Sequence, residues 1–466
     1  MGSALKLRSV PLAAALTLAG CAHYEAVPVD TQALARQRET ARLDEAAVAG
    51  EVRRIAPGAD LAPWQWNKLS LLAAALLYNP DIAAARAGIE TASAQALAAR
   101  QAPGSTLTLA SEYAHDTSAS SPWLLGGALD VPLDIGGVRK ARIAGAALAV
   151  DDARYVYADT LWSARMAIDR ALIESIGSTE RAGLYHQLAD LRARQLAAME
   201  RRVTAGAASR TELERVRAEG ADAARLASDA DHAVEAAKIA LAAAVGVPEA
   251  AFPNADWPGF ADPAPLPLQA TSREQLRQAM LARPGILRAM VAYGQAEQAL
   301  RGEVARQYPQ ITLSPGYTWE RGLVKLPFNI GLALPPLDLN RHAIAAAEAS
   351  RSEKGKQVEA AVASARAAVD SALSECAAAR LALQHVREIE LPNAERLAER
   401  ADREMAAGAI NRVDWASAKA GALTARINAS DALVRVHSAD AALEDALQRP
   451  LSGPELLMAQ DRGSKE

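Results

Sequence analysis

Residues that commonly perform chemistry are few in this chain and lie far apart in the sequence. Its seven histidines form neither a His-x-x-x-His pair nor a cluster with either of the two cysteines, so we predict no metal site. No nucleophile elbow occurs, and Gly136-Gly137 lacks the following Lys-Ser/Thr pair of a phosphate-binding loop. We therefore predict no catalytic residue and no cofactor, and we expect that the protein is not an enzyme.

Cys21 is the one residue whose surroundings indicate covalent modification. Lys6 and Arg8 precede an apolar stretch, Val10 to Leu18, which leads into Leu18-Ala19-Gly20-Cys21. This pattern predicts a secretory signal peptide over residues 1–20. The tetrapeptide resembles the lipobox of bacterial lipoproteins, which implies lipidation of Cys21 and, because Ala22 follows, sorting to the outer membrane. The alternative is an ordinary secreted protein in which this cysteine is accidental.

Composition favours long helices with small side chains at their contacts. Of the 466 residues 50% are hydrophobic but only 4% are aromatic, and alanine accounts for much of the apolar content. The net charge is −4 and no basic block occurs, so nucleic acid is not expected as a partner. If Cys21 is acylated, Cys376 has no partner for an intramolecular disulfide.

An internal repeat with a period of about 200 residues organises the chain. Five landmarks recur in the same order: Asn79-Pro80-Asp81-Ile82 with Arg283-Pro284-Gly285-Ile286, Ala99-Arg100-Gln101-Ala102-Pro103 with Ala305-Arg306-Gln307-Tyr308-Pro309, Leu129-Asp130-Val131-Pro132-Leu133-Asp134 with Leu334-Pro335-Pro336-Leu337-Asp338, Ser163-Ala164-Arg165 with Ser364-Ala365-Arg366, and Ala205-Gly206-Ala207 with Ala407-Gly408-Ala409. We therefore divide the mature chain into an N-terminal anchor and equatorial segment (21–66), a first repeat (67–246), a Pro-rich linker (247–272), a second repeat (273–447) and a C-terminal equatorial tail (448–466). The three segments outside the repeats are expected to form an irregular belt around the middle of the helices.

Each repeat is predicted to run helix, two strands, very long helix, turn, helix. The long helix of the first repeat should extend from about Val138 to Thr204, on the order of 100 Å. Its counterpart should extend from about Arg341 to Ala406, with a kink at Pro392. The shorter helices, about Pro80 to Arg100 and Arg210 to Val245, could stack end to end. The predicted heptad-like apolar seam of the first long helix contains Tyr157, Leu161, Ala164, Ile168 and Ala171.

Four segments between the helices alternate apolar and polar residues, as transmembrane β-strands do. They cover about 104–116, 122–133, 309–320 and 325–336. Soluble hairpins with one buried face would show the same pattern. Four strands do not close a barrel, and lipid tolerates no open sheet edge, so several copies would have to pool their strands. Two copies give eight strands and three give twelve, and the sequence does not choose between the two numbers.

The repeat, the Asn79-Pro80 entry, the turn Leu133-Asp134-Ile135-Gly136-Gly137 and the glycines Gly206 and Gly408 together resemble the TolC-like outer-membrane efflux proteins. The resemblance covers nearly the whole mature chain. It implies a homotrimer in which a twelve-stranded outer-membrane β-barrel, four strands per protomer, continues into a periplasmic α-barrel of long helical hairpins. Such a protein lies in the cell outer membrane, in contact with its lipid and with a large periplasmic extension. It acts as the exit duct of a tripartite pump, with a periplasmic membrane-fusion adaptor and an inner-membrane RND-type transporter.

Within that family, two segments look most like the cobalt–zinc–cadmium branch of cation efflux: Gly136-Gly137-Val138-Arg139-Lys140-Ala141-Arg142-Ile143 and Leu337-Asp338-Leu339-Asn340-Arg341-His342-Ala343-Ile344. Val138 departs from that branch, which often carries a basic residue there. The resemblance therefore implies passive passage of substrates that could be heavy-metal cations. A wide water-filled duct needs no binding site for its cargo, so the lack of a metal-ligand cluster is compatible with this function.

The turns between the antiparallel helices are where the resemblance places function. The tips should dock the adaptor, through Gly206, Ser209, Arg210, Glu212, Gly408, Asn411, Arg412 and Asp414. Charged residues just before the tips could form a gate: Arg201, Arg202, Asp402, Arg403 and Glu404. Helix capping and dipole interactions explain many of these carboxylates without any such role.

Three other functions are compatible with parts of the sequence. A periplasmic coiled-coil structural or adaptor lipoprotein would have the helices but no continuous outward apolar face on its strands. A periplasmic hydrolase would need converging catalytic groups. A duct for type I protein secretion shares the fold and differs only in its cargo.

Overall fold

The computed structural model describes residues 24–58, 64–113, 121–252, 257–263, 273–320 and 322–451. Two compact units are present, residues 1–41 and 42–466. The described part of the first unit contains helix α2, Thr31–Glu39, whose N-cap Asp30 accepts hydrogen bonds from the backbone amides of Gln32 and Ala33. The signal peptide and lipidation site predicted at residues 1–20 and Cys21 lie outside the described residues.

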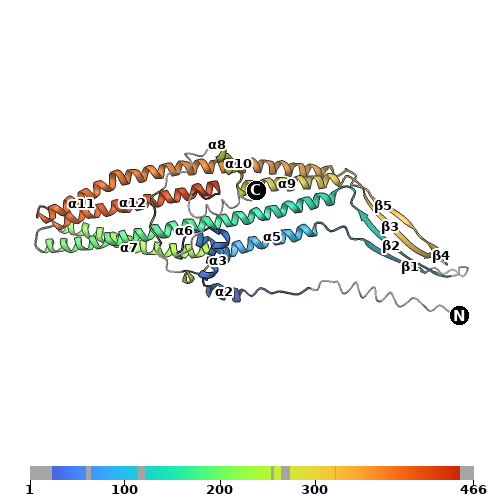
Figure 1. The fold of residues 1–466 in the computed structure, drawn as a ribbon, viewed down its shortest axis with the longest axis horizontal. Helices are drawn as coiled ribbons and strands as arrows, with labels where there is room; N and C mark the ends of the chain where they lie inside the picture. Colours follow the sequence, from blue (N-terminus) through green and yellow to red (C-terminus); the bar gives the residue numbers. More distant parts are fainter. Residues whose placement is uncertain are drawn as a thin grey trace. The chain divides into compact units, whose positions relative to one another are not determined.

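The second unit contains long antiparallel helices and a sheet that lies beyond one end of them (Figure 1). Its helices are α3 (Glu45–Ile55), α4 (Lys68–Tyr78), α5 (Pro80–Ala98), α6 (Val138–Thr204), α7 (Arg210–Val245), the 3₁₀ turn η1 (Glu249–Ala251), α8 (Arg273–Leu281), α9 (Pro284–Ala305), α10 (Arg341–His385), α11 (Leu391–Ala406) and α12 (Arg412–Leu447). Its strands are β1 (Thr106–Tyr113), β2 (Trp123–Leu133), β3 (Gln310–Glu320), β4 (Leu323–Lys325) and β5 (Phe328–Ala333). This is the predicted mainly α fold with a β part.

Helix α6 is the element against which most of the second unit packs. It contacts α4, α5, α7, α9 and α12. All five predicted seam residues belong to one apolar cluster that includes Leu69, Leu241 and Val245 from α4 and α7. The seam is therefore confirmed, and its two alanines, Ala164 and Ala171, leave room for the helices to approach closely.

The long helix of the second repeat is interrupted near the proline where a kink is expected. A π-helical turn, Val386–Glu390, separates α10 from α11, and Pro392 follows in the first turn of α11. Pro392 has no N–H to donate to the carbonyl of Glu388, four residues earlier, and a π turn is a common way for a helix to absorb such a break.

The shorter helices α5 and α7 meet end to end, as predicted. The side-chain oxygen of Asn79 caps α5 by accepting from Asp81 N and Ile82 N. Its amide nitrogen donates to the carbonyl oxygen of Ala244 in the last turn of α7, at 3.0 Å. Gly246 ends α7 with φ +92°, and a Cβ at this residue would lie 2.6 Å from Asn79 Cα. Only glycine fits this joint, for both its conformation and its lack of volume.

The strands form one antiparallel sheet in which β1, β2 and β3 are neighbours and β4 and β5 both pair with the far side of β3. Residues paired across neighbouring strands point to the same face of the sheet. The register places four apolar pairs on one face: Leu107 opposite Leu129, Leu125 opposite Trp319, Val131 opposite Leu313 and Leu313 opposite Ile330. Many side chains on this face are exposed, among them Leu109 (76%), Phe328 (62%) and Ile330 (63%), while Val131, Leu313 and Trp319 are half-buried. The predicted alternation is thus present.

The fourth predicted strand, 325–336, is divided and shorter. Within it only β5, Phe328–Ala333, is a full strand. Leu326 and Pro327 separate β5 from β4, which begins earlier than predicted and ends at Lys325. Proline lacks the amide that a ladder needs, and here Gly316 N donates to the Pro327 carbonyl oxygen at 2.8 Å instead. Strand β5 ends at Ala333 because Pro335 and Pro336 follow.

The belt expected to be irregular also differs in its N-terminal part. That segment contains α2 and α3, because Asp30 and Asp44 each cap a helix by accepting two backbone amides. Trp64, Trp66, Phe252 and Trp257 pack beside the main apolar cluster. Residues 21–23, 59–63, 253–256, 264–272 and 452–466 of the belt lie outside the described residues.

Cys376 is a buried packing residue, as expected. Its thiol is fully buried and donates to the Ala439 carbonyl oxygen at 3.2 Å. Burial raises its pKa to about 11, so the reactive thiolate is scarce near neutral pH. In the described part of the chain, no helix combines the length and apolarity needed to cross a membrane.

The helix joint provides a test of this packing. We expect Gly246→Ala to lower the free energy of unfolding by about 2–4 kcal/mol, because it adds overpacking against Asn79 to the cost of a positive φ. Gly408→Ala is the matched control: its φ is +73°, but no atom lies within 4 Å of an added Cβ, so about 1 kcal/mol is expected. Denaturant unfolding in detergent, followed by circular dichroism, measures both. Equal losses of unfolding free energy in the two variants would contradict the close packing of Gly246 against Asn79.

Candidate functional site at the helical tips

The two helical hairpins end in turns of the same construction. Gly206 and Gly408 adopt φ of +72° and +73°. In each turn the next amide donates back to a helix carbonyl, Ala207 N to Arg202 O and Ala409 N to Glu404 O, both at 2.8 Å. Nothing lies within 4 Å of a Cβ at either glycine, so the glycines are required for the left-handed conformation alone.

The predicted polar tip residues are largely committed to helix capping. Ser209 and Glu212 form a reciprocal capping box at the start of α7. The hydrogen bonds between Ser209 and the Glu212 carboxylate hold the pKa of Glu212 below its ordinary value. Asn411 accepts from Val413 N and Asp414 N, and its amide donates to the Asp414 carboxylate at 2.7 Å. Capping therefore accounts for these four side chains.

Two tip arginines are not committed in this way. Arg210 and Arg412 occupy the first position of α7 and α12, the corresponding places in the two repeats. Both are exposed. Within the described ranges, neither side chain makes a hydrogen bond or an ion pair. These two cations are therefore available to a partner.

The residues predicted as a gate lie near the tips but do not join the two hairpins. Arg201 and Arg202 donate to carbonyl oxygens of Ala197 and Ala207 in their own hairpin. Asp402 accepts from Trp415 Nε1 at 2.7 Å and from Lys419 Nζ at 3.0 Å, both on the adjoining helix α12. These hydrogen bonds keep the pKa of Asp402 below its usual range. The side chains of Arg403 and Glu404 make no polar contact among the described residues.

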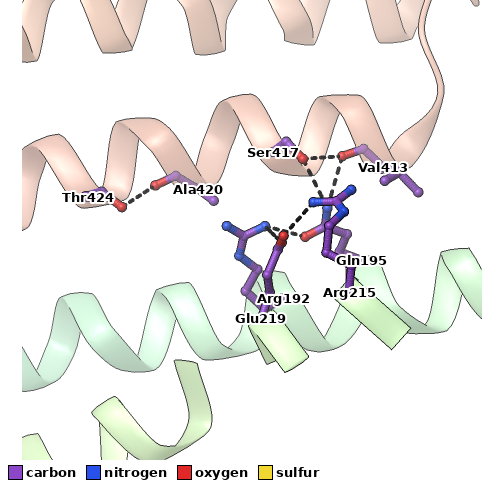
Figure 2. A network of polar contacts seen from close by, with 8 residues as sticks. All are labelled: Arg192, Gln195, Arg215, Glu219, Val413, Ser417, Ala420 and Thr424. Atoms are coloured by element: carbon purple, nitrogen blue, oxygen red, sulfur yellow. Dashed lines mark hydrogen bonds and ion pairs between the residues drawn. The ribbon is translucent and has the colours of Figure 1, made fainter. Parts of the chain in front are cut away.

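A different set of residues links the hairpins, and it is centred on Gln195 (Figure 2). Gln195 lies on α6 and is 1% exposed. Its amide nitrogen donates to Ser417 Oγ at 3.1 Å and to the Val413 carbonyl oxygen at 3.3 Å, both on α12. Its carbonyl oxygen accepts from Arg192 at 2.7 Å. The buried amide thus reaches from the first hairpin into the second.

Helix α7 joins the same network through a carboxylate. Glu219 accepts from Arg192 at 2.8 Å and from Arg215 at 2.5 Å. Arg192 therefore bridges Gln195 and Glu219, and three helices are connected by one chain of polar contacts (Figure 2). We call Arg192, Gln195, Arg215, Glu219 and Ser417 the tip network.

Sequence reasoning missed Gln195, although a signal was present. Leu188, Leu191, Gln195 and Ala198 are spaced 3-4-3 on α6, and all four are buried. A lone amide in an apolar heptad seam is a known device for fixing register. The prediction instead favoured charged residues beside the turns.

A polar groove of about 450 Å³ lies beside the tip network, between α6, α11 and α12. Three acidic residues and three basic residues line it: Asp190, Glu395, Glu399, Arg194, Lys419 and Arg426. Arg426 pairs with Glu395 at 3.0 Å. The balanced charges do not favour an ion of either sign, and no group of three or more potential metal ligands occurs among the described residues.

The sequence model of the family described as outer membrane efflux protein matches residues 71–247 and 276–448. The chain belongs to this family. The predicted resemblance to TolC-like efflux proteins is thereby confirmed. As a member of the efflux protein family, the chain is not an enzyme.

Several known proteins are similar to most of the chain. The cobalt-zinc-cadmium resistance protein CzcC of Cupriavidus metallidurans is 27% identical over 379 residues, which are 80% of this chain and 87% of that protein. The outer membrane protein VceC of Vibrio cholerae has a TM-score of 0.67 at 19% identity, and the match covers 83% of this chain and 97% of that chain. CusC, whose structures concern transmembrane channel formation, has a TM-score of 0.68 at 15% identity, covering 83% and 93%. The two structural matches show a shared fold.

The tip network can be tested by a double-mutant cycle. We expect Gln195→Ala and Ser417→Ala to be coupled by about 0.5–1.5 kcal/mol, because each removes one end of the same hydrogen bond. Thr424→Ala is the matched control: its hydroxyl also lies on α12 but donates to Ala420 O within that helix, at 3.0 Å. Its coupling to Gln195→Ala should be near zero. Unfolding free energies in detergent give both values, and equal couplings would refute the link.

Proposed function

We propose that the protein is the outer-membrane channel subunit of a tripartite efflux pump and conducts its cargo passively from the periplasm to the exterior. The observation that carries the proposal is the sheet, whose apolar side chains share one face and whose two outer edges have no strand partner among the described residues. A soluble adaptor would have to cover this face. In lipid the face needs no cover, but the two edges need strand partners.

The edges support assembly from several copies. The sheet is four strands wide, because β4 and β5 both pair with the same side of β3 and together take the place of one strand. Edge β1 of one copy could pair with edge β4–β5 of the next, and three copies would close a twelve-stranded barrel. The resemblance to TolC-like proteins favours three over two. The long helices would then form the wall of a periplasmic tunnel, and lipids on Cys21 would add a second attachment to the outer membrane.

The tips are proposed to dock a periplasmic adaptor protein, which in turn joins an inner-membrane RND-type transporter. The support is the pair Arg210 and Arg412, exposed and without polar contacts in the described part of the chain. An adaptor that presents carboxylates to these guanidinium groups would be attracted to both repeats at equivalent positions. Gly206, Ser209, Glu212, Gly408, Asn411 and Asp414 would hold the shape of the turns.

The gate is proposed to include the tip network. Separating the first hairpin from α12 would break the contacts of Gln195 with Ser417 and Val413. The residues predicted earlier, Arg201, Arg202, Asp402, Arg403 and Glu404, would act at the same level by stiffening each hairpin or by meeting a neighbouring copy.

Heavy-metal cations are proposed as the cargo. The support is the similarity to a cobalt-zinc-cadmium resistance protein over 80% of the chain. Type I protein secretion is the alternative that uses the same fold.

Assembly and conduction can be tested on the mature protein in detergent. We expect a heat-labile trimer on electrophoresis and single-channel conductance in planar bilayers, because the strand edges must pair before the apolar face can sit in lipid. We expect Gln195→Ala to raise the open probability severalfold, with Thr424→Ala unchanged. Absence of both trimer and conductance would reject the channel. Conductance that Gln195→Ala leaves unaltered would reject only the gate.

Cargo can be tested in the organism that carries the gene. Deletion should increase sensitivity to cobalt, zinc and cadmium salts, since cations would then remain in the periplasm. Restoring the unaltered gene, or the Thr424→Ala variant, should restore tolerance. If metal tolerance does not change while the purified channel still conducts, the duct stands and this cargo is wrong.

A further inference from the structure

A second cavity lies where the sheet meets the helices, at the foot of its two central strands. Its volume is about 260 Å³. The walls come from the end of β2 and the turn after it (132–136), from the junction of α9 and β3 (305–306 and 308–310), and from Arg139 and Arg142 at the start of α6. Gly136 makes the corner possible, since a Cβ there would lie 2.6 Å from the Ala305 carbonyl oxygen.

The cavity carries positive charge that the described residues do not neutralise. Arg142 donates to the carbonyl oxygens of Ala99 at 3.1 Å and Gln101 at 2.8 Å, and Arg139 donates to that of Arg100. These acceptors are uncharged. Nowhere in the described ranges does a carboxylate form an ion pair with either arginine. Arg139 Nε is buried and has no hydrogen-bond partner.

A neighbouring cavity of about 340 Å³ extends this cationic region. Arg139 lines both cavities, and Lys140 lines the second. Lys140 is exposed, and its ammonium has no polar partner among the described residues. Asp134 also lines both cavities, but its carboxylate accepts from the backbone amide of Arg139 at 2.9 Å. Four cations line the two cavities, and Arg306 pairs with Glu303 at 2.5 Å. The other three, Arg139, Lys140 and Arg142, therefore face one carboxylate that already has a donor.

The two cavities lie at the limit of the apolar face of the sheet. Leu133 is the last residue of β2, belongs to that face and lines the first cavity. Ile135 and Tyr308 extend the apolar surface beyond the strands and are 61% and 60% exposed. If the apolar face lies in lipid, Arg139 and Lys140 stand at the level of the headgroups, where cationic side chains meet anionic lipids.

We propose that this junction binds the headgroup of an anionic phospholipid from the leaflet on the helical side. The proposal rests on the proposed membrane function. Phosphate oxygens would accept hydrogen bonds from the Arg139 guanidinium, while Lys140 adds a point charge. The acyl chains would lie along Leu133 and the apolar face. The pocket is on β2 and β3, so pairing of the outer strands with other copies leaves it in place.

The test uses the mature protein in nanodiscs of phosphatidylcholine with a minor fraction of phosphatidylglycerol. Native mass spectrometry after detergent release should find phosphatidylglycerol retained by the unaltered protein, and about tenfold less retained by Arg139→Gln combined with Lys140→Gln, because a charge-assisted contact is lost. Arg154→Gln is the matched control. It lies on the same helix, with its side chain 65% exposed and paired with Asp151.

Each outcome has a distinct meaning. Equal retention by all three proteins overturns the headgroup site. Displacement of phosphatidylglycerol by millimolar inorganic phosphate shows a phosphate site without lipid specificity, and also overturns it. Trimer formation and conductance are measured separately in phosphatidylcholine alone. If those fail, the proposed function fails. If they hold in every variant while retention falls in the double variant, the site is supported.

Discussion

Close approach of helices along α6 is the constraint on which the rest of the structure depends. Alanine and glycine occupy many of the contacts, and the spacing is so tight that a Cβ at Gly177 would lie 2.5 Å from a methyl group of Val434 on α12. Dispersion contacts are individually weak, but a seam that runs along a 67-residue helix collects many of them. This explains how a chain with 4% aromatic residues can still hold its helices in register.

The two repeats share a sequence pattern but not an environment. Arg165 of the first repeat is buried, stacks on Trp162 at 4.7 Å and pairs with the buried Glu444 at 2.6 Å. Its counterpart Arg366 is exposed and pairs only loosely with Asp370 in the same helix, at 3.7 Å. Helix α6 has neighbours on several sides, whereas α10 packs mainly on α9 and α12. The proposed oligomer would cover the side of α10 that the single chain leaves open.

Local patterns were sufficient to predict much of the fold from sequence. The ends of α6 at Val138 and Thr204 follow from Gly137 before the helix and Gly206 after it, and strand alternation gave the correct face for each strand. Interruptions were harder. The division of the fourth strand depends on the pairing of Pro327 with Gly316, which no single segment shows. Gln195 was missed because its importance lies in what faces it on α12, 218 residues away.

The tip network links the first hairpin to α12 through two hydrogen bonds, both donated by the uncharged side chain of Gln195. Each hydrogen bond of Gln195 to α12 contributes about 1 kcal/mol net, so the two together favour the joined state by about 2 kcal/mol. A ligand must supply about 5.5 kcal/mol of differential binding to reverse a 1:99 equilibrium. In the proposed gate, an adaptor that gains two charge-assisted contacts, at Arg210 and Arg412, could supply about 3–6 kcal/mol. These magnitudes are comparable, so docking at the tips could overcome the polar contacts. Opening would also have to separate the apolar contacts between α6 and α12 beside Gln195, among them those in the cluster of Met199 and Val413.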